Sequence, residues 1–269
     1  MNLKILENCK IAVCFSGQSR TFKNCAESVN NFFTSKKGNQ FVFFGHTWDS
    51  NDYPKIKIHG NHVIQRETNI DIEMLENDIR ELYNFENLIV EKQIMTAGHI
   101  PWSSMFYSMM RVNFLKQKYE VENNMMFDLV IKCRYDLCFR QEKIFEDFFN
   151  LIEEKTLYGH DKGHMGPEFF LPVPDDVIYF GSSLTMDLVD SLYNSLCTGS
   201  FFKLVGYNDH NPAYKIVGPN ALINKWANMK NIRIVHNPLD YVIYRKSADG
   251  LNYKTDWDQI CQLGNAIFY

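Results

Sequence analysis

The chain has 269 residues, 45% of them hydrophobic and 14% aromatic, and a formal net charge of -4. This composition provides a sizeable apolar core and excludes an intrinsically disordered chain. The sequence contains neither a basic block nor an apolar run of the roughly 20 residues that span a bilayer, so we expect no nucleic-acid partner and no transmembrane segment.

The cysteines and the N-terminus point to a reducing compartment. The seven cysteines form no CxxC pair, which argues against a zinc site and against a disulfide framework. The first ten residues, MNLKILENCK, lack the apolar stretch of a secretory signal. We therefore expect reduced thiols and a cytoplasmic protein.

The first half of the chain alternates strand and helix patterns. Strands are expected at 10–15, 40–49, 61–67, 87–93 and 127–139, and helices at 21–33, 71–84 and 101–120. Apolar residues at helical spacing predict that one face of the last helix is buried, and these are Trp102, Phe106, Met109, Met110 and Phe114. Such alternation is typical of a mainly parallel sheet with helices on its faces.

The second half is less regular. A strand is expected at 175–183, helices at 184–197 and 218–230, and one or two strands at 232–246, with a break at Pro238. The segment 158–166, YGHDKGHMG, is interpreted as a mobile loop. We expect one domain, residues 1–269, with two halves that meet near residue 140.

The first candidate site is the loop between the first strand and the first helix. Ligands of open parallel sheets bind beyond the carboxyl ends of the strands. The helix N-terminus favours an anion, and Arg20 adds a bidentate phosphate donor. Either the loop is an ordinary turn or it binds phosphate, and on the second interpretation the nucleotide-binding residues are Ser16, Gly17, Gln18, Ser19 and Arg20.

The second candidate site lies in FDLVIKCRYDLCF, residues 127–139, which reads as one buried strand. Lys132, Arg134 and Asp136 fall on one face of that strand. The charges form either a structural ion pair or a site for a charged ligand, because a buried charge is costly unless it is paired.

Several stretches resemble small bacterial and viral glycosyltransferases, including the WavE-like lipopolysaccharide-synthesis proteins. The resemblance covers roughly residues 8–245, and the stretches that carry it are YEVENNMMFDLVIKCRYDLCF, KIAVCFSGQSRTF, FFGHTWD, WSSMFYSMMRVN and DDVIYFGSSLTMDLVDSLY. It implies an α/β protein of the GT-A-like (Rossmann-like) fold, a mostly parallel sheet flanked by helices. It also implies a nucleotide-binding half, residues 1–140, and a less regular acceptor-binding half, residues 141–269.

The resemblance also implies site residues. Such transferases carry an Asp-x-Asp motif whose second carboxylate binds a divalent cation on the donor diphosphate. In this chain Arg134-Tyr135-Asp136 stands in its place, so Asp136 matches the metal ligand and Arg134 replaces the first carboxylate. We expect Arg134 and Asp136 to act in catalysis and activity to depend in part on Mg²⁺ or Mn²⁺. His236 is either a second metal ligand or a surface or capped histidine.

Further candidates come from two other segments. The stretch GHTWD ends a strand at the same sheet edge as the first loop, and it adds His46, Trp48 and Asp49 to the nucleotide-binding candidates, with Trp48 either stacked on a ligand or part of the core. An inverting transferase needs a general base. We take Asp209 as a catalytic candidate, and the other acidic and histidine residues that stay open are Glu168, Asp175, Asp176 and His210.

The sequence thus predicts a glycosyltransferase that moves a sugar from a nucleotide-sugar to a glycan, a lipid-linked glycan (glycolipid) or a protein. The alternative is a non-catalytic nucleotide- or carbohydrate-binding protein on the same fold, in which Arg134 marks lost chemistry. A methyltransferase is less consistent with the sequence, because no Gly-rich loop follows the first strand.

Overall fold

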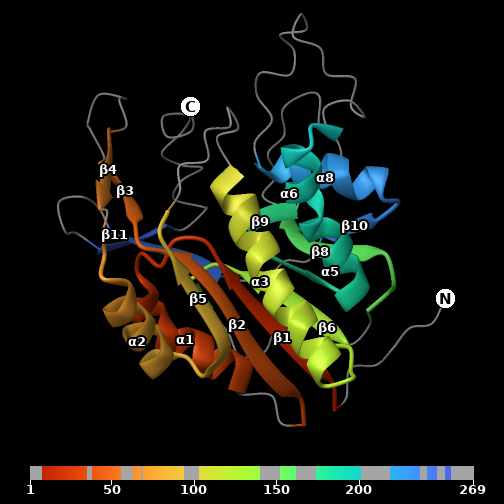
Figure 1. The fold of residues 1–269 in the computed structure, drawn as a ribbon, viewed down its shortest axis with the longest axis horizontal. Coiled ribbons are helices and arrows are strands. Elements are labelled where there is room, and N and C mark those ends of the chain that lie inside the picture. The colour runs from red at the N-terminus through yellow and green to blue at the C-terminus, as the bar shows by residue number, and fades with distance from the viewer. Residues whose placement is uncertain are drawn as a thin grey trace, which may run out of the picture.

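The protein is a three-layer arrangement of helices on both faces of one sheet, shown in the computed structural model of Figure 1. The structure describes residues 8–34, 38–55, 63–67, 69–93, 103–139, 152–161, 174–200, 219–236, 241–246 and 252–255. The structural statements that follow concern these residues.

The main sheet has seven strands in the order β10-β8-β9-β6-β1-β2-β5. In chain order the strands are β1 (Lys10–Ser16), β2 (Gln40–Trp48), β5 (Phe85–Glu91), β6 (Leu129–Cys133), β8 (Thr156–Asp161), β9 (Pro174–Gly181) and β10 (Arg233–His236). Of these, β9 runs antiparallel to its neighbours β6 and β8. Strands from before and after residue 140 therefore share one sheet.

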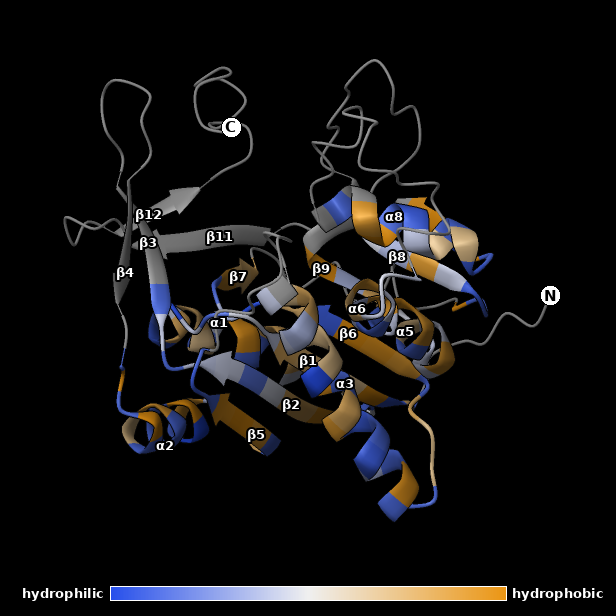
Figure 2. Cartoon of the chain, turned by 45° about the horizontal axis from the view of Figure 1, so that its top comes forward, coloured by the Kyte–Doolittle hydropathy of each residue, from blue (hydrophilic) through white to orange (hydrophobic). Residues whose placement is uncertain are grey.

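The two faces of the sheet carry different helices. One face is covered by α1 (Phe22–Thr34) and α2 (Ile72–Leu82), and the other by α3 (Ser103–Glu122), α5 (Ser183–Asp190), α6 (Leu192–Cys197) and α8 (Pro219–Met229). Alternate residues of β1 divide between the two cores, with Val13 in the first and Cys14 in the second. Because both faces are buried, β1 and β6 are apolar along most of their length, and β2 is apolar in its first half after Gln40 and more polar near its end (Figure 2).

The local sequence accounts for the helix boundaries. Asp71 caps α2 by accepting a hydrogen bond from the backbone N–H of Met74. Pro219 opens α8, where its missing N–H costs no helical hydrogen bond. These signals explain why the expected helices begin within a residue or two of their observed positions.

The expected single strand over 127–139 is wrong. β6 ends at Cys133, residues 134–136 turn, and the chain continues as β7 (Leu137–Phe139) in a separate sheet with β11 (Tyr241–Lys246) and β12 (Asn252–Thr255). In an extended chain residues i and i+2 lie about 7 Å apart. The turn instead brings Arg134 and Asp136 into a bidentate ion pair.

A third, two-stranded sheet pairs β3 (Asn51–Lys55) with β4 (Val63–Glu67).

Three smaller expectations are also corrected. The helix expected at 184–197 is two helices, α5 and α6, separated at Ser191. Residues 158–161 belong to β8 and are not a loop. Phe114 is 50% exposed, although Phe106 and Met109 on the same helix are buried as expected. Trp102 lies outside the described residues.

The expected fold class is confirmed: a mixed α/β protein with a GT-A-like (Rossmann-like), mostly parallel sheet flanked by helices. No helix in the described part of the chain is both long and apolar enough to cross a membrane.

Candidate functional site

The candidate site lies where β1, β2 and β6 end. These strands are parallel neighbours, so the loop after Ser16, the segment after Trp48 and the turn at 134–136 meet at one edge of the sheet. This edge is where open α/β sheets bind ligands. The two segments predicted from the sequence as candidate sites, the first loop and the Arg134-Tyr135-Asp136 turn, therefore come together.

The first loop has an unusual backbone at two positions. Gly17 has a φ of 107°, and Arg20, which has a side chain, has a φ of 42°. A left-handed conformation at a residue other than glycine costs on the order of 1–3 kcal/mol and is often found at functional sites. Asn51 holds this conformation, because its Oδ1 accepts a 2.8 Å hydrogen bond from the backbone N–H of Arg20 and a 3.3 Å bond from Ser19 Oγ. No motif in the sequence marks Asn51 as part of this site.

Two arginines converge on one carboxylate. Arg134 donates from Nε to Asp136 Oδ1 at 2.9 Å and from Nη2 to Oδ2 at 2.6 Å. Arg20, 116 residues away along the chain, donates from Nη1 to Asp136 Oδ2 at 3.1 Å. Its Nε also donates to Gln18 Oε1 at 3.0 Å. The Asp136 side chain is 1% exposed, whereas those of Arg20 and Arg134 are 21% and 17% exposed, so the two arginines are the more exposed members of this cluster.

Tyr135 holds the turn at 134–136 against the core of the protein. Its ring is fully buried and packs against Phe15 and Phe85, with centroid distances of 5.4 Å and 6.3 Å. The packing of this ring fixes the position of the turn that carries Arg134 and Asp136. Burial raises the pKa of its hydroxyl well above the usual value.

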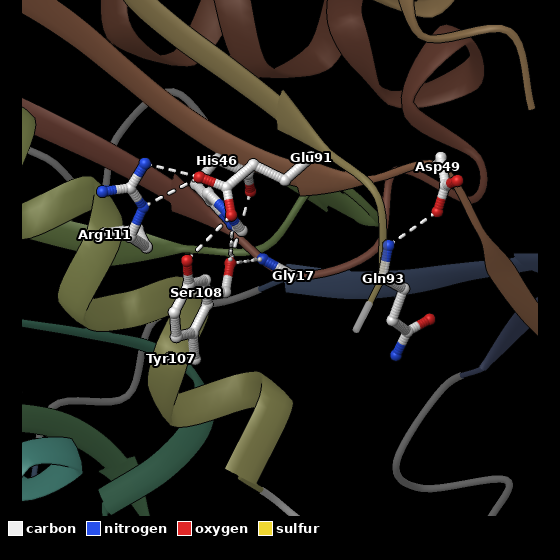
Figure 3. A network of polar contacts seen from close by, with 8 residues as sticks. All are labelled: Gly17, His46, Asp49, Glu91, Gln93, Tyr107, Ser108 and Arg111. Carbon is white, nitrogen blue, oxygen red and sulfur yellow. Dashed lines mark hydrogen bonds and ion pairs between the residues drawn. The ribbon is translucent and has the colours of Figure 1, made fainter. Parts of the chain in front are cut away.

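A second polar network, drawn in Figure 3, ties the first loop to α3. Ser108 Oγ accepts a 2.7 Å hydrogen bond from the backbone N–H of Gly17 and lies 2.7 Å from Nδ1 of His46. The same hydroxyl lies 3.4 Å from the backbone carbonyl oxygen of His46, to which it can donate, and the other ring nitrogen of His46 is Nε2. That atom lies 3.6 Å from Glu91 Oε2, which is long for a hydrogen bond. His46 is fully buried, and burial lowers its pKa despite the nearby carboxylate.

Glu91 is a partly exposed carboxylate in this network and joins Tyr107 to Arg111. Tyr107 donates from its hydroxyl to Glu91 Oε2 at 2.9 Å, and Arg111 donates from Nε to Oε1 at 2.9 Å. The nearby His46 ring, together with hydrogen bonds from Tyr107 and Arg111, lowers the pKa of Glu91 to about 2. Glu91 is therefore a fixed negative charge and a poor proton acceptor at neutral pH.

The residues at the end of β2 are buried and contact other parts of the protein. Trp48 is 4% exposed and stacks on Tyr107 with a centroid distance of 5.3 Å, so its ring packs within the protein. Asp49 is 6% exposed, and its Oδ1 accepts a 2.7 Å hydrogen bond from the backbone N–H of Gln93 (Figure 3). These contacts support the site through the packing of His46, Trp48 and Asp49. Direct contact of these residues with a nucleotide stays a prediction.

Lys132 extends toward the face of the sheet that α3 and α5 cover. Its Nζ lies 5.2 Å from the centroid of the Tyr179 ring, which belongs to the core on that face. A buried carboxylate near it is Asp190, whose pKa is raised well above the usual value by burial and by the charge of Asp187, against the opposing effect of Lys116 and Lys132. The charge of Lys132 therefore favours the ionised form of Asp190.

The remaining candidates are placed only in part. Ser16, at the end of β1, is 2% exposed, and its Oγ has no hydrogen-bond partner among the described residues. His236 ends β10, where its backbone pairs with Gly159, and its side chain is not described. Asp209 lies outside the described residues, as do Glu168 and His210.

The surroundings of Asp136 do not fit a divalent cation. Mg²⁺ and Mn²⁺ favour several oxygen ligands at close range. Both oxygens of Asp136 already accept hydrogen bonds from guanidinium groups, whose positive charge repels a cation. Within the described ranges no group of three or more histidine, cysteine, aspartate or glutamate side chains is arranged to hold a metal ion.

Comparisons with known proteins leave the family open. No family model and no curated sequence matches the chain. One solved structure similar to it is a glycosyltransferase involved in the glycosylation of the major capsid of PBCV-1. The two chains are 9% identical, the match covers 86% of this chain and 82% of that chain, and the TM-score is 0.40. A similarity of this size supports no conclusion about function.

Proposed function

We propose that the protein is a glycosyltransferase that uses a nucleotide-sugar donor. The donor binds at the carboxyl edge of the sheet, with its diphosphate between the first loop and the 134–136 turn. Residues 1–140 then hold the nucleotide and residues 141–269 the acceptor, which is a glycan, a lipid-linked glycan (glycolipid) or a protein.

The observation that carries this proposal is the convergence of Arg20 and Arg134 on Asp136 at this edge. Guanidinium groups match the oxygens of a diphosphate in charge and in planar geometry. The N-terminus of α1 lies in the same loop, and its first turn contains no acidic residue that would cancel the positive end of the helix dipole.

The same groups supply the chemistry that transfer requires. When the bond between the sugar and the diphosphate breaks, negative charge develops on the leaving phosphate oxygen. Donors that are already in place stabilise that charge without rearranging during the reaction. An acceptor hydroxyl must lose a proton in an inverting reaction, and Asp209 remains our candidate for that base.

The test is a panel of nucleoside diphosphates followed by their sugar conjugates. We expect the matching nucleotide, at about 100 times its Kd, to raise the Tm by roughly 5 °C, since this corresponds to about 2.7 kcal/mol of stabilisation. We also expect slow release of that nucleotide from the matching nucleotide-sugar in the absence of an acceptor. The proposal is wrong if no nucleotide shifts the Tm and no nucleotide-sugar is cleaved.

The alternative function, a non-catalytic binding protein on the same fold, is favoured by one observation: Arg134 occupies a position where the resemblance implies a carboxylate. In that case a nucleotide-sugar raises the Tm, but no nucleotide is released with any acceptor tested.

A further inference from the structure

We propose that Arg20 and Arg134 bind the donor diphosphate directly, without a divalent cation, and that Asp136 is a positioning residue for the two guanidinium groups. This inference rests on the proposed function and specifies how its site recognises the donor. It differs from the metal site that the sequence predicts, in which Asp136 is a ligand of Mg²⁺ or Mn²⁺.

The first support is the set of atoms around Asp136. Its Oδ2 accepts hydrogen bonds from both arginines, at 2.6 Å and 3.1 Å, and its Oδ1 accepts one from Arg134 at 2.9 Å. A cation bound to either oxygen would lie beside at least one permanently charged guanidinium. The carboxylate is also 1% exposed, so a cation between it and a ligand would have to displace an arginine.

The second support is the arrangement of charge. In the cluster of Arg20, Arg134 and Asp136, two guanidinium groups meet one carboxylate. The carboxylate is buried while both arginine side chains are partly exposed, so an arriving anion meets the cationic groups first. The two guanidinium groups attract a diphosphate and repel a hydrated Mg²⁺ ion.

The third support is preorganisation. Arg134 is held by a bidentate pair with Asp136, and Arg20 is held at its backbone N–H and at its guanidinium group. Asn51 fixes the backbone of Arg20 in the left-handed conformation, and Gln18 and Asp136 bind its guanidinium. Fixing long side chains before the ligand arrives reduces the entropy lost on binding. On this proposal, the left-handed backbone of Arg20 directs its side chain toward the 134–136 turn.

The experiment measures binding of inorganic pyrophosphate and of a nucleoside diphosphate panel by calorimetry, in EDTA and in the presence of MgCl₂ or MnCl₂. We expect pyrophosphate and the matching nucleotide to bind in EDTA within about threefold of their affinity with the cation. Arg20→Gln and Arg134→Gln should each weaken binding in EDTA by roughly 10- to 100-fold, the range for a charge-assisted bidentate contact.

Two further variants provide controls. Arg80→Gln removes an arginine on α2 that is 40% exposed and pairs with Glu76, so it tests a general loss of positive charge and should leave binding unchanged. Asp136→Asn tests the positioning role, and it should weaken pyrophosphate binding by the same factor with and without the cation. A metal ligand would instead lose only the cation-dependent part of the affinity.

The outcomes separate this inference from the proposed function. Nucleotide binding that disappears in EDTA and returns with Mn²⁺ overturns the cation-free site and leaves the glycosyltransferase proposal standing. Arginine-dependent pyrophosphate binding in EDTA, together with failure of every nucleotide-sugar to bind or react, supports the anion site and overturns the function. Absence of pyrophosphate and nucleotide binding under all conditions overturns the inference.

Discussion

The hydroxyl oxygen of Tyr135 lies 2.7 Å from the point where a Cβ atom on Gly45 would stand. The same point is 2.6 Å from Leu88 Cδ1 and 2.9 Å from Phe85 Cε1. A side chain at position 45 is therefore excluded by the packing of Tyr135, the residue between Arg134 and Asp136. The absence of a side chain in β2 thus allows the turn of the candidate site to sit close against the sheet.

Gly45→Ala should destabilise the protein by about 1–3 kcal/mol, the usual cost of overpacking a core, and lower the Tm by several degrees. Urea denaturation with the Tm as a second readout measures this. Tyr135→Phe is the matched variant, since the hydroxyl has no hydrogen-bond partner among the described residues, and it should be close to neutral. Combining Tyr135→Phe with Gly45→Ala should recover part of the loss, because the hydroxyl that meets the new methyl group is gone. A strictly additive result would mean that Tyr135 does not pack against position 45.

Ser108→Ala should destabilise the first loop. The change leaves the Gly17 N–H and His46 Nδ1 without their hydroxyl partner in a buried site, at a cost of about 1–3 kcal/mol. Hydrogen exchange should speed up at Gly17 more than at residues in the middle of β1. Ser191→Ala serves as the control, because its Oγ bonds only locally to the carbonyl of Leu188. Equal exchange at Gly17 in the wild type and in Ser108→Ala would contradict the network.

Glu91 should contribute stability that depends on pH in the acid range. Its pKa is about 2 in the folded protein against a usual 4.5. Because the folded-state pKa is depressed, the contribution is fully present above pH 4.5 and is lost as the pH falls toward 2. The difference in unfolding free energy between the wild type and Glu91→Gln should therefore shrink over that window. A difference that does not change with pH would show that the carboxylate has no charged partners in solution.

Lys116→Met should be strongly destabilising. Lys116 is fully buried on α3, and its Nζ contacts Ser183 Oγ at 2.5 Å, Asp187 Oδ1 at 2.7 Å and Glu120 Oε2 at 3.0 Å. Removing the Lys116 ammonium leaves the carboxylates of Asp187 and Glu120 without this partner, which should lower the free energy of unfolding by about 3–5 kcal/mol. Lys118→Met, two residues along the same helix, is the control, since Lys118 is 56% exposed and its pair with Glu122 is 3.6 Å long. Comparable losses of unfolding free energy in the two variants would refute a special role for Lys116.

The sequence by itself determined the elements whose signals are local. Short apolar runs predicted β1, β2 and the start of β6, helical spacing predicted α1 and α3, and Pro219 marked the start of α8. The residues at every second position from Leu129 to Leu137 do lie in one core, even though the expected strand is broken. These features follow from contacts between residues a few positions apart, which a periodic pattern records.

Only the tertiary structure decided which side chains meet. Arg20 reaches Asp136 across 116 residues, Ser108 reaches Gly17 across 91, and Asn51 reaches Arg20 across 31. No pattern along the chain marks Ser108 or Asn51, because each is a single polar residue whose partner is brought close by the sheet. The pairing of Asp136 with two arginines, and the burial of Trp48 behind Tyr107, likewise depend on how the strand ends are packed together.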